Sequence, residues 1–291
     1  MLTLELRFVA GRYHATPWGR HVNEGVPEWP PSPFRLLRSL VDAWLRKRPD
    51  WPPERVEPIM RALAGEAPVF QLPDARASHT RSYLSQNTRD PSDKQLVFDA
   101  FAVAPRPVVV AWPSVSLTAR QQEDLAELLS LLSYLGRSES WVEARVVDAS
   151  TTAWNCRPRV QPEENEEPVL VACARPTPFE PTANGKSRKK ARPDTGVPDW
   201  VDALCWTTAE VASAGLSHPP SLEMVPYVRR RDCFQGRSGV PGRLALSEVQ
   251  AVMYRLESRV PPNCTDGLKV AEQVRSMVMG SYRRITQSEI P

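Results

Sequence analysis

Apolar and polar side chains alternate along residues 1–8, and this pattern constrains the fold more than any other feature of the sequence. The apolar positions are Leu2, Leu4, Leu6 and Phe8. Residues two apart on a strand lie on the same face, so the pattern predicts a strand with one buried face. We therefore expect this segment to open a sheet.

A segment that begins at Ser32 has the periodicity of an amphipathic helix. Ser32 is a favourable N-cap, and Pro33 suits the first helical turn. Arg35 falls on a polar face, and Pro49 lies just past the expected end. The apolar residues recur at steps of three and four, at Phe34, Leu37, Leu40, Val41, Trp44 and Leu45.

Strand-like and helical segments then follow one another. Residues 77–84 and 95–104 read as two strands that flank the polar connector Ser85–Lys94, and a further β-rich run covers Val108–Trp112. Residues 141–147 read as another strand. The order strand, helix, strand, strand, helix, strand predicts an α+β chain with a ferredoxin-like arrangement, related to the RNA-recognition fold.

The second helix of this order is expected after Thr118. Thr118 and Gln121 have the spacing of a capping box, and Gly136 suits the C-terminal end. The expected buried positions are Leu125, Leu128, Leu129, Leu132 and Leu135. Because these leucines recur at helical spacing, they predict a helix packed on the sheet.

Composition divides the chain into three parts. Residues 1–150 are the expected ferredoxin-like domain, with an insertion near residues 85–94. Residues 151–242 are rich in proline and in charged runs, and they form a loop-rich extension with strands expected at 169–174 and 227–231. Residues 243–291 begin a second ferredoxin-like unit, which is incomplete in this sequence.

Net charge and cysteine content constrain the function less than the strand and helix patterns constrain the fold. The net charge of +3 does not by itself decide for nucleic acid, and the basic stretch 186–192 fits a solvated loop and an RNA contact equally well. The cysteines are widely spaced, so we expect free thiols and neither a metal nor another cofactor. They are Cys156, Cys173, Cys205, Cys233 and Cys264.

Two further absences concern localisation. No segment reads as a signal peptide, and no apolar run approaches the roughly 20 residues of a membrane helix. We therefore expect a soluble, cytoplasmic protein.

The connector after the first strand is the densest group of residues that could bind RNA. Arginine binds phosphate, while flat rings stack on unpaired bases at about 1 to 3 kcal/mol each. A rigid loop whose rings pack inward would have the same composition, and the sequence leaves both interpretations open. The candidate contacts are Arg12, Tyr13, His14, Trp18, Arg20 and His21, followed by Arg35 on the helix.

Two further groups join this set. His79, Arg81 and Tyr83 have period-two spacing and so lie on one face of a strand, although a solvent-facing strand would also carry them. Arg137 follows Gly136 in a sharp turn, where it is equally suited to phosphate or to an ion pair with a glutamate. A metal-independent endoribonuclease that uses His14 or His21 with Tyr13 is the enzyme alternative, because such cleavage needs a general acid and a general base.

No phosphate-binding loop, dinucleotide fingerprint or nucleophile elbow is present. The glycines at positions 236, 239 and 242 match none of these spacings. The sequence therefore favours RNA binding over nucleotide-dependent or hydrolase chemistry.

Long strings of the sequence resemble a known family. The segments GRYHATPWGRHVNEGVPEWPPSPFRLLRSLVDAW, LVFDAFAVAP and SYLGRSESWVEARV are similar to the large Cas-five subunit of type I-G (formerly I-U) CRISPR systems. In this family of the RAMP superfamily a Cas-five domain is fused to a C-terminal Cas-six domain. The resemblance covers residues 1–148 and resumes at SHPPSLEMVPYVRRRD, and residues 265–285 resemble the first Cas-six helix.

The resemblance implies a role in antiviral defence, within the CRISPR effector complex Cascade. The protein would hold the 5′ handle of the crRNA, contact the first Cas-seven backbone subunit and the large subunit, and meet target DNA through the assembled complex. Ser85–Lys94 matches the family's thumb. Arg12, Tyr13, His14, Arg20 and Arg137 would be the leading handle contacts. Most of the Cas-six part lies beyond this sequence, so the resemblance assigns no catalytic residue.

The function we expect is therefore that of a non-catalytic crRNA-binding subunit. Its central expectation is that Tyr13, Arg20 and Arg137 share one groove at the edge of a four-stranded sheet, where an unpaired RNA end binds. The endoribonuclease is one alternative. A scaffold that contacts only proteins is another, and it would not retain RNA.

Overall fold

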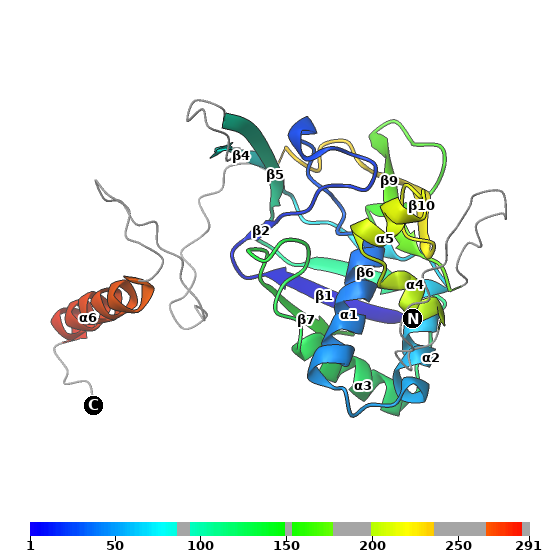
Figure 1. Ribbon diagram of the computed structural model, residues 1–291, viewed down its shortest axis with the longest axis horizontal. Coiled ribbons are helices and arrows are strands. Elements are labelled where there is room, and N and C mark those ends of the chain that lie inside the picture. The colour runs from blue at the N-terminus through cyan, green and yellow to red at the C-terminus, as the bar shows by residue number, and fades with distance from the viewer. Residues whose placement is uncertain (86–93, 149–152, 177–198, 236–265, 287–291) are drawn as a thin grey trace. The chain divides into compact units, whose positions relative to one another are not determined.

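The computed structural model describes residues 1–85, 94–148, 153–176, 199–235 and 266–286. The chain forms two compact units, Met1–Glu248 and Val249–Pro291. The first unit holds the sheets and all but one of the described helices (Figure 1).

The centre of the first unit is a ferredoxin-like core. Its strands and helices follow the chain in the order strand, helices, strand, strand, helix, strand. The sheet order is β7-β1-β6-β3, and each neighbouring pair is antiparallel. Numbered within the core this order is 4-1-3-2, so the protein has the expected α+β, ferredoxin-like fold. The elements are β1 (Leu2–Phe8), α1 (Pro33–Lys47), α2 (Pro53–Ala64), β3 (Val69–Gln71), β6 (Val108–Trp112), α3 (Ala119–Ser130) and β7 (Val142–Val146).

The second and third core strands differ from those expected. Residues 77–84 and 95–104 do form strands, β4 (Arg76–Ser85) and β5 (Lys94–Val103), but these pair with each other outside the core sheet. With β2 (Arg12–Tyr13) they form a three-stranded sheet of order β2-β5-β4. The core strands are β3 and β6, so the insertion between them is the whole hairpin. Residues 86–93 of the connector lie outside the described residues.

Residues beyond 150 extend the core sheet. The seven-stranded order is β7-β1-β6-β3-β8-β10-β9, so the strands expected near 169–174 and 227–231 are confirmed. This part also contains two short helices. Its elements are β8 (Cys156–Pro158), β9 (Glu166–Ala174), α4 (Asp199–Leu204), α5 (Thr208–Ser213) and β10 (Leu222–Arg230). The basic stretch 186–192 lies outside the described residues.

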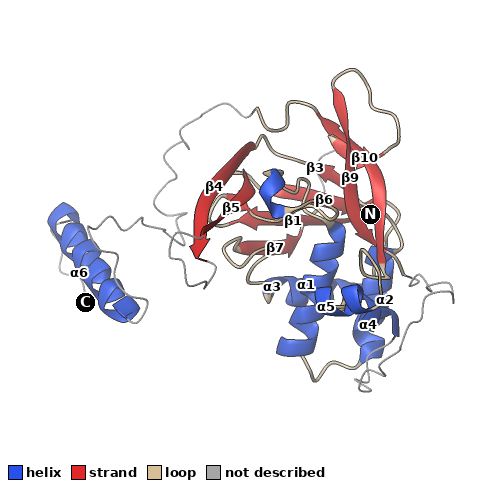
Figure 2. Ribbon diagram, turned by 45° about the horizontal axis from the view of Figure 1, so that its top comes forward, coloured by secondary structure: helices blue, strands red, loops and turns tan. Residues whose placement is uncertain are grey.

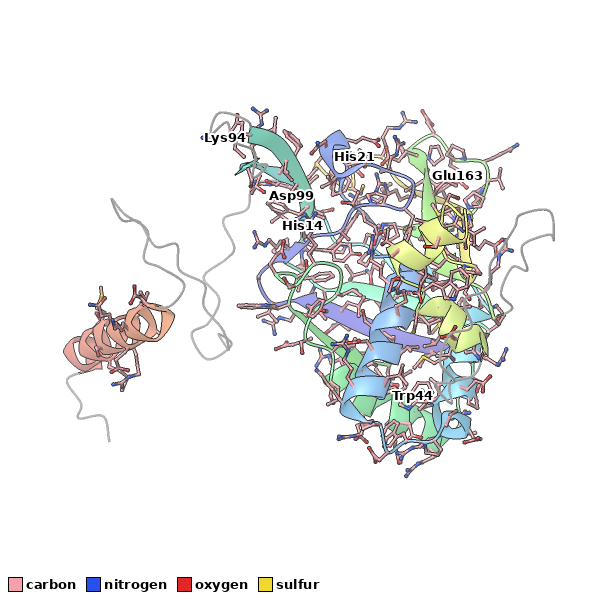
Figure 3. The ribbon with its side chains drawn as sticks, viewed as in Figure 1. His14, His21, Trp44, Lys94, Asp99 and Glu163 are labelled. Carbon is pink, nitrogen blue, oxygen red and sulfur yellow. The ribbon has the colours of Figure 1, made fainter. Side chains whose placement is uncertain are left out.

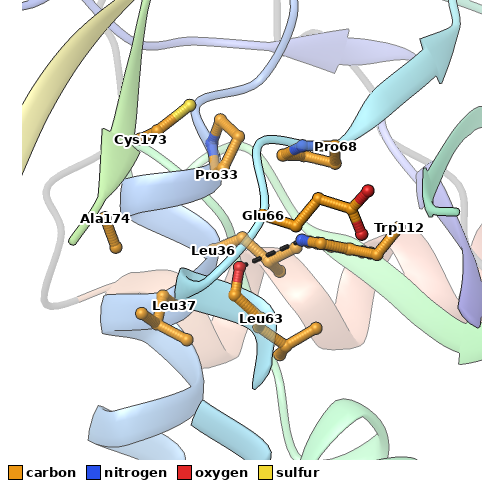
Figure 4. Close-up of a pocket in the computed structure, with 9 residues that line it drawn as sticks. All are labelled: Pro33, Leu36, Leu37, Leu63, Glu66, Pro68, Trp112, Cys173 and Ala174. Carbon is orange, nitrogen blue, oxygen red and sulfur yellow. Dashed lines mark hydrogen bonds between the residues drawn. The ribbon is translucent and has the colours of Figure 1, made fainter. Parts of the chain in front are cut away.

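The core lies between the sheet and its helices. Figure 2 shows α1, α2 and α3 gathered on one side of the strands. The expected buried face of β1 is confirmed, and on α1 only Leu45 of the expected apolar set is exposed. Figure 4 shows side chains of α1, α2, β6 and β9 around a small gap in this core. Its volume is about 10 Å³, which is room for one water molecule at most. There the Trp112 indole N–H donates to the carbonyl of Leu63 at 3.0 Å.

The ends of the helices follow the sequence signals closely. Ser32 accepts a hydrogen bond from the amide of Arg35, and Thr118 forms the expected capping box with Gln121. The expectation for Gly136 is wrong, because α3 already ends at Ser130. Gly136 instead occupies the turn before β7, with a φ of 87°.

An ion pair joins α2 to α3. The Arg55 guanidinium lies 3.6 Å from the ring centroid of Trp51 and donates to both carboxylate oxygens of Asp124, at 2.6 and 3.0 Å. Arg120 also lies 3.3 Å from this carboxylate. The hydrogen bonds from Arg55 outweigh desolvation and lower the pKa of Asp124.

This lowered pKa predicts how Asp124→Asn will behave with pH. The native carboxylate stabilises the fold above its unfolded pKa of about 3.9, and this stabilisation is lost as pH falls through the lower, folded value. The difference in unfolding free energy between wild type and Asp124→Asn should therefore be largest near neutral pH and shrink below about pH 4. Urea denaturation across this range measures it, and a constant difference would contradict the assignment.

The second unit contains one described helix, α6 (Gly267–Thr286). The strand expected from residue 244 lies outside the described residues. Among the described residues, Cys156, Cys173, Cys205 and Cys233 form no disulfide bond. Within the described ranges, no helix is long and apolar enough to span a membrane.

Candidate nucleic-acid interface

One face of the β4–β5 hairpin carries the aromatic and basic side chains expected there. In the antiparallel register His79 stands opposite Ala100, Arg81 opposite Phe98, and Tyr83 opposite Leu96. Directly opposed residues project to the same face. We call the group His79, Arg81, Tyr83, Lys94, Leu96 and Phe98 the hairpin platform.

The rings of the hairpin platform are accessible and partly prearranged. His79 stacks on Phe98 with ring centroids 4.3 Å apart and an interplanar angle of 18°. The Arg81 guanidinium lies 5.2 Å from the centroid of the same Phe98 ring. Tyr83, farther along the strand, is 67% exposed and Leu96 is 40% exposed. The platform therefore offers flat and cationic surfaces to a ligand without rearrangement.

The charge of the hairpin platform is positive only. Its side of the hairpin carries Arg81 and Lys94, and no Asp or Glu of β4 or β5 projects to that side. Within the described part of the chain, neither cation has an ion-pair partner, whereas Arg46, Arg61 and Arg145 are all paired. An unpaired cation beside an exposed ring suits a phosphate next to a stacked base.

A short 3-10 turn, η1 (Val22–Glu24), supports this platform from the edge of β5. The amide of Phe98 donates to the Asn23 side-chain oxygen at 3.0 Å. Gly25 has a φ of 68°, and a Cβ there would lie 2.9 Å from the Phe98 ring. His21 is the N-cap of the turn and accepts from the amide of Asn23. His21 thus has a structural role beside the platform.

Arg12, His14 and Arg137 lie on the opposite face of the hairpin, around Asp99. His14 is buried, with its Nδ1 2.5 Å from Glu139 and its Nε2 3.7 Å from Asp99. Arg137 pairs with Asp99 at 2.9 Å. Arg12 lies 5.5 Å from the centroid of Phe101. Figure 3 shows Asp99 between His14 and the outer residue Lys94.

Tyr13 and Arg35 belong to a buried network around Glu28. Tyr13 is 0% exposed, and its hydroxyl donates to the Glu28 carboxylate. Arg35 Nε donates to both oxygens of that carboxylate, at 3.0 and 3.1 Å, and the amide of Ser32 donates at 3.1 Å. Burial first, and then the charge of Glu28, raises the pKa of Tyr13 well above its ordinary value. Because its ring offers no accessible face, Tyr13 cannot stack on a base in this conformation.

Trp18 and Arg20 lie at a third place, a groove between residues 17–32 and strands β9 and β10. Trp18 packs edge-on against Phe34 with centroids 5.8 Å apart, and Arg20 pairs with Glu24. The structure thus distributes the candidate residues over separate places. The expectation that Tyr13, Arg20 and Arg137 share one groove is wrong, because Tyr13 is in the core and Arg137 lies beside Asp99.

This arrangement also bears on the endoribonuclease alternative. The His14 ring is enclosed by Glu139, Asp99 and Phe101, while the Tyr13 hydroxyl is bound to Glu28. Neither group reaches a surface where it would meet a phosphodiester. In the described ranges, no cluster of three or more His, Cys, Asp or Glu side chains is suited to a metal ion.

Sequence reasoning missed three residues of the hairpin platform. Phe98 and Leu96 were expected only as strand residues, and Lys94 only as the end of the polar connector. Their signal was the pairing register, since each stands opposite a β4 residue of the same face. If Ser85–Lys94 is taken as the loop of a hairpin, pairing the two strands outward from Ser85 and Lys94 places all three residues on the face of His79, Arg81 and Tyr83.

Comparisons with known proteins add little to this geometry. No protein-family model matches the chain, and no curated protein matches it. Among solved structures, the chain is similar to Cas6 of Thermus thermophilus, with 19% identity and a TM-score of 0.27. The alignment covers 50% of this chain and 53% of that one, so it spans about half of the Cas6 chain. A likeness at this level carries no argument about function.

Proposed function

We propose that this protein binds single-stranded RNA on the hairpin platform. The observation that carries the proposal is the pair of cations Arg81 and Lys94, which have no ion-pair partner among the described residues and lie beside the stacked and exposed rings on one face of the hairpin. Single-stranded RNA is recognised by stacking of its unpaired bases on aromatic rings and by cationic contacts to its phosphates. Tyr83 and the His79–Phe98 pair would stack the bases, and Arg81 and Lys94 would bind the phosphates.

The more specific proposal identifies this RNA as the 5′ handle of a crRNA. Its support is the resemblance of residues 1–148 to the Cas-five subunit of type I-G CRISPR systems. On this proposal the protein is a non-catalytic subunit of Cascade, which contacts the Cas-seven backbone and the large subunit in antiviral defence. The hairpin lies between the second and third core strands, and the resemblance implies a thumb at that place.

The platform is tested by Arg81→Ala and Tyr83→Ala. Loss of one stacked ring is expected to weaken RNA binding by about 5- to 150-fold, the equivalent of about 1 to 3 kcal/mol. Loss of Arg81 should also reduce the salt dependence of log K by about 0.7 for the phosphate contact removed. A filter-binding titration with a repeat-derived RNA at several salt concentrations measures both effects.

Matched controls come from the same strand and from a distant helix. Ser82→Ala alters the opposite face of β4, and Arg46→Ala removes an exposed cation of α1 that pairs with Asp42. Both should bind RNA as the wild type does. Equal affinity of Arg81→Ala, Tyr83→Ala and these controls would contradict the platform.

The more specific proposal is tested by the choice of RNA. The handle sequence should bind more tightly than a scrambled RNA of the same length, and it should copurify with the protein, as read from the ultraviolet absorbance spectrum. Repeat RNA should stay intact during incubation in EDTA, because binding without cleavage is proposed. Equal binding of both RNAs would indicate that the protein binds RNA without sequence preference, and it would contradict the handle assignment.

A further inference from the structure

Strand β9 leaves one edge of the seven-stranded sheet open in the part of the chain that the structure describes. It ends the strand order and pairs with β10 on its other side. The Ser32 hydroxyl donates to the Ala172 carbonyl at 2.7 Å, so the backbone of Ala172 faces away from β10. Alternate residues of an antiparallel strand direct their backbone groups to the same side, so Leu170 and Pro168 face the same way.

The register gives independent support for this direction. Leu170 stands opposite Pro226, which has no N–H and cannot complete a hydrogen-bonded pair. The Pro226 carbonyl instead accepts from the amide of Arg159, on the β8 side, at 3.0 Å. The N–H and C=O of Leu170 therefore point out of the sheet, where they meet no partner among the described residues.

A groove of about 600 Å³ lies along this open edge. One wall is formed by residues 168–172 of β9 together with Met224, Pro226 and Arg229 of β10, and the other by residues 17–20 and 26–30. Both walls carry accessible apolar side chains, since Leu170 is 60% exposed and Val26 is 41% exposed. The volume is within the range of roughly 300 to 1,000 Å³ for binding clefts, and the lining is mostly apolar as such clefts are.

The accessible charge of the groove is the cation Arg20. Its side chain is 58% exposed, and it pairs with Glu24 at 2.9 Å. Arg229 also lies in the lining, but it is 13% exposed and is bound by Glu167 and by the carbonyl of Trp29. The indole N–H groups of Trp18 and Trp29 are buried. The lining carboxylate, Glu28, already accepts from Tyr13, Ser32 and Arg35. The groove therefore offers a cation to a carboxylate of its ligand.

We propose that the groove binds an extended peptide segment of a partner protein, which adds to β9 as a further strand. The open backbone of Leu170 selects a polypeptide over a nucleic acid, because only a strand supplies amide and carbonyl groups at the matching spacing. The apolar walls select alternating apolar side chains, and the exposed cation Arg20 favours an acidic residue at an end of the segment. This proposal is independent of RNA binding on the hairpin platform.

The probe is a short fluorescein-labelled synthetic peptide in which valine and threonine alternate between terminal glutamates. Fluorescence anisotropy with the full chain should show saturable binding. A version with proline at its centre should bind at least about tenfold more weakly, because it lacks a ladder donor. A version with terminal lysines should also bind more weakly, since the exposed cation Arg20 lies in the lining.

Two protein variants locate the site. Leu170→Pro removes the outward N–H, and Leu170→Asp places a carboxylate among the apolar walls. Each should weaken binding of the glutamate-ended peptide by about tenfold or more. Val160→Asp makes the same charge change at an exposed apolar residue outside the groove lining and should bind normally. Circular dichroism and the thermal unfolding midpoint confirm that each variant is folded.

Four results would overturn the proposal. One is absence of peptide binding to the wild type, and another is equal binding by the Leu170 variants and Val160→Asp. The third is displacement of the peptide by single-stranded RNA from Tyr83→Ala, whose platform is impaired, because the groove would then be an RNA site. A dimer that is lost in Leu170→Asp, measured by sedimentation, would assign the edge to a second copy of this chain instead.

Discussion

Glu28→Ala is expected to lower the free energy of unfolding by about 3 kcal/mol, which is a large part of the stability of a typical domain. Glu28 accepts hydrogen bonds from Tyr13, Ser32 and Arg35, and its side chain is 7% exposed. Its removal leaves a buried hydroxyl, an amide and a guanidinium without their acceptor. Breaking a buried ion pair costs about 3 to 5 kcal/mol, and the 27% exposure of Arg35 places this case at the lower end.

Urea denaturation followed by tryptophan fluorescence measures this loss. Glu28→Gln keeps an acceptor oxygen but not the charge, so its unfolding free energy should fall between those of Glu28→Ala and the wild type. Glu24→Ala removes an exposed carboxylate that pairs with Arg20 and accepts from the amide of His21 in the cap of η1, so it should cost far less stability than Glu28→Ala. The double variant Glu28→Leu, Arg35→Met should recover part of the loss, because apolar pairs replace buried ion pairs at little cost. Equal stability of Glu28→Ala and Glu24→Ala would contradict the network.

Local patterns predicted the elements of the core well where the pattern of apolar residues continues over several repeats. The alternation in residues 2–8 and the three-and-four spacing from Phe34 correspond to β1 and α1 as observed. The caps at Ser32 and Thr118 are also as expected. These features depend on neighbouring residues alone, so the sequence carries them directly.

Sheet membership was less predictable, because it depends on residues far apart in the chain. The second core strand, Val69–Gln71, is three residues long and too short to show a period. The β4–β5 hairpin has longer and more regular strands, and so it was assigned to the core in place of β3 and β6. Its own pairing with β2 gives it a separate sheet, which only the long-range register reveals.

The same distinction separates the residues of the candidate site. His79, Arg81 and Tyr83 lie on one face of a single strand, which their spacing alone predicted. For Tyr13 the sequence left open whether the ring contacts RNA or packs inward. In the structure, Ala102 opposite it and Glu28 fifteen residues away hold it in the core. Composition cannot distinguish an inward ring from an outward one, since both occur in loops rich in Arg, Tyr and Trp.

Gly136→Ala is the second substitution with a large expected effect, because two costs add at this turn. Gly136 has a φ of 87°, and a Cβ there would lie 2.5 Å from the backbone carbonyl oxygen of His14. That carbonyl accepts from the amide of Arg137 at 2.9 Å, so it cannot move away freely. A left-handed conformation costs about 1 to 2 kcal/mol and overpacking about 1 to 3 kcal/mol, which together predict a loss of about 2 to 5 kcal/mol.

Gly215→Ala is the matched control for Gly136→Ala, because it separates the two costs. Gly215 has a φ of 69°, and a Cβ there would meet no atom within 4 Å. It should lose only the conformational part, about 1 to 2 kcal/mol. The difference between the two variants in urea denaturation then measures the contact with His14. If both variants lost the same stability, the turn would not be closed against His14.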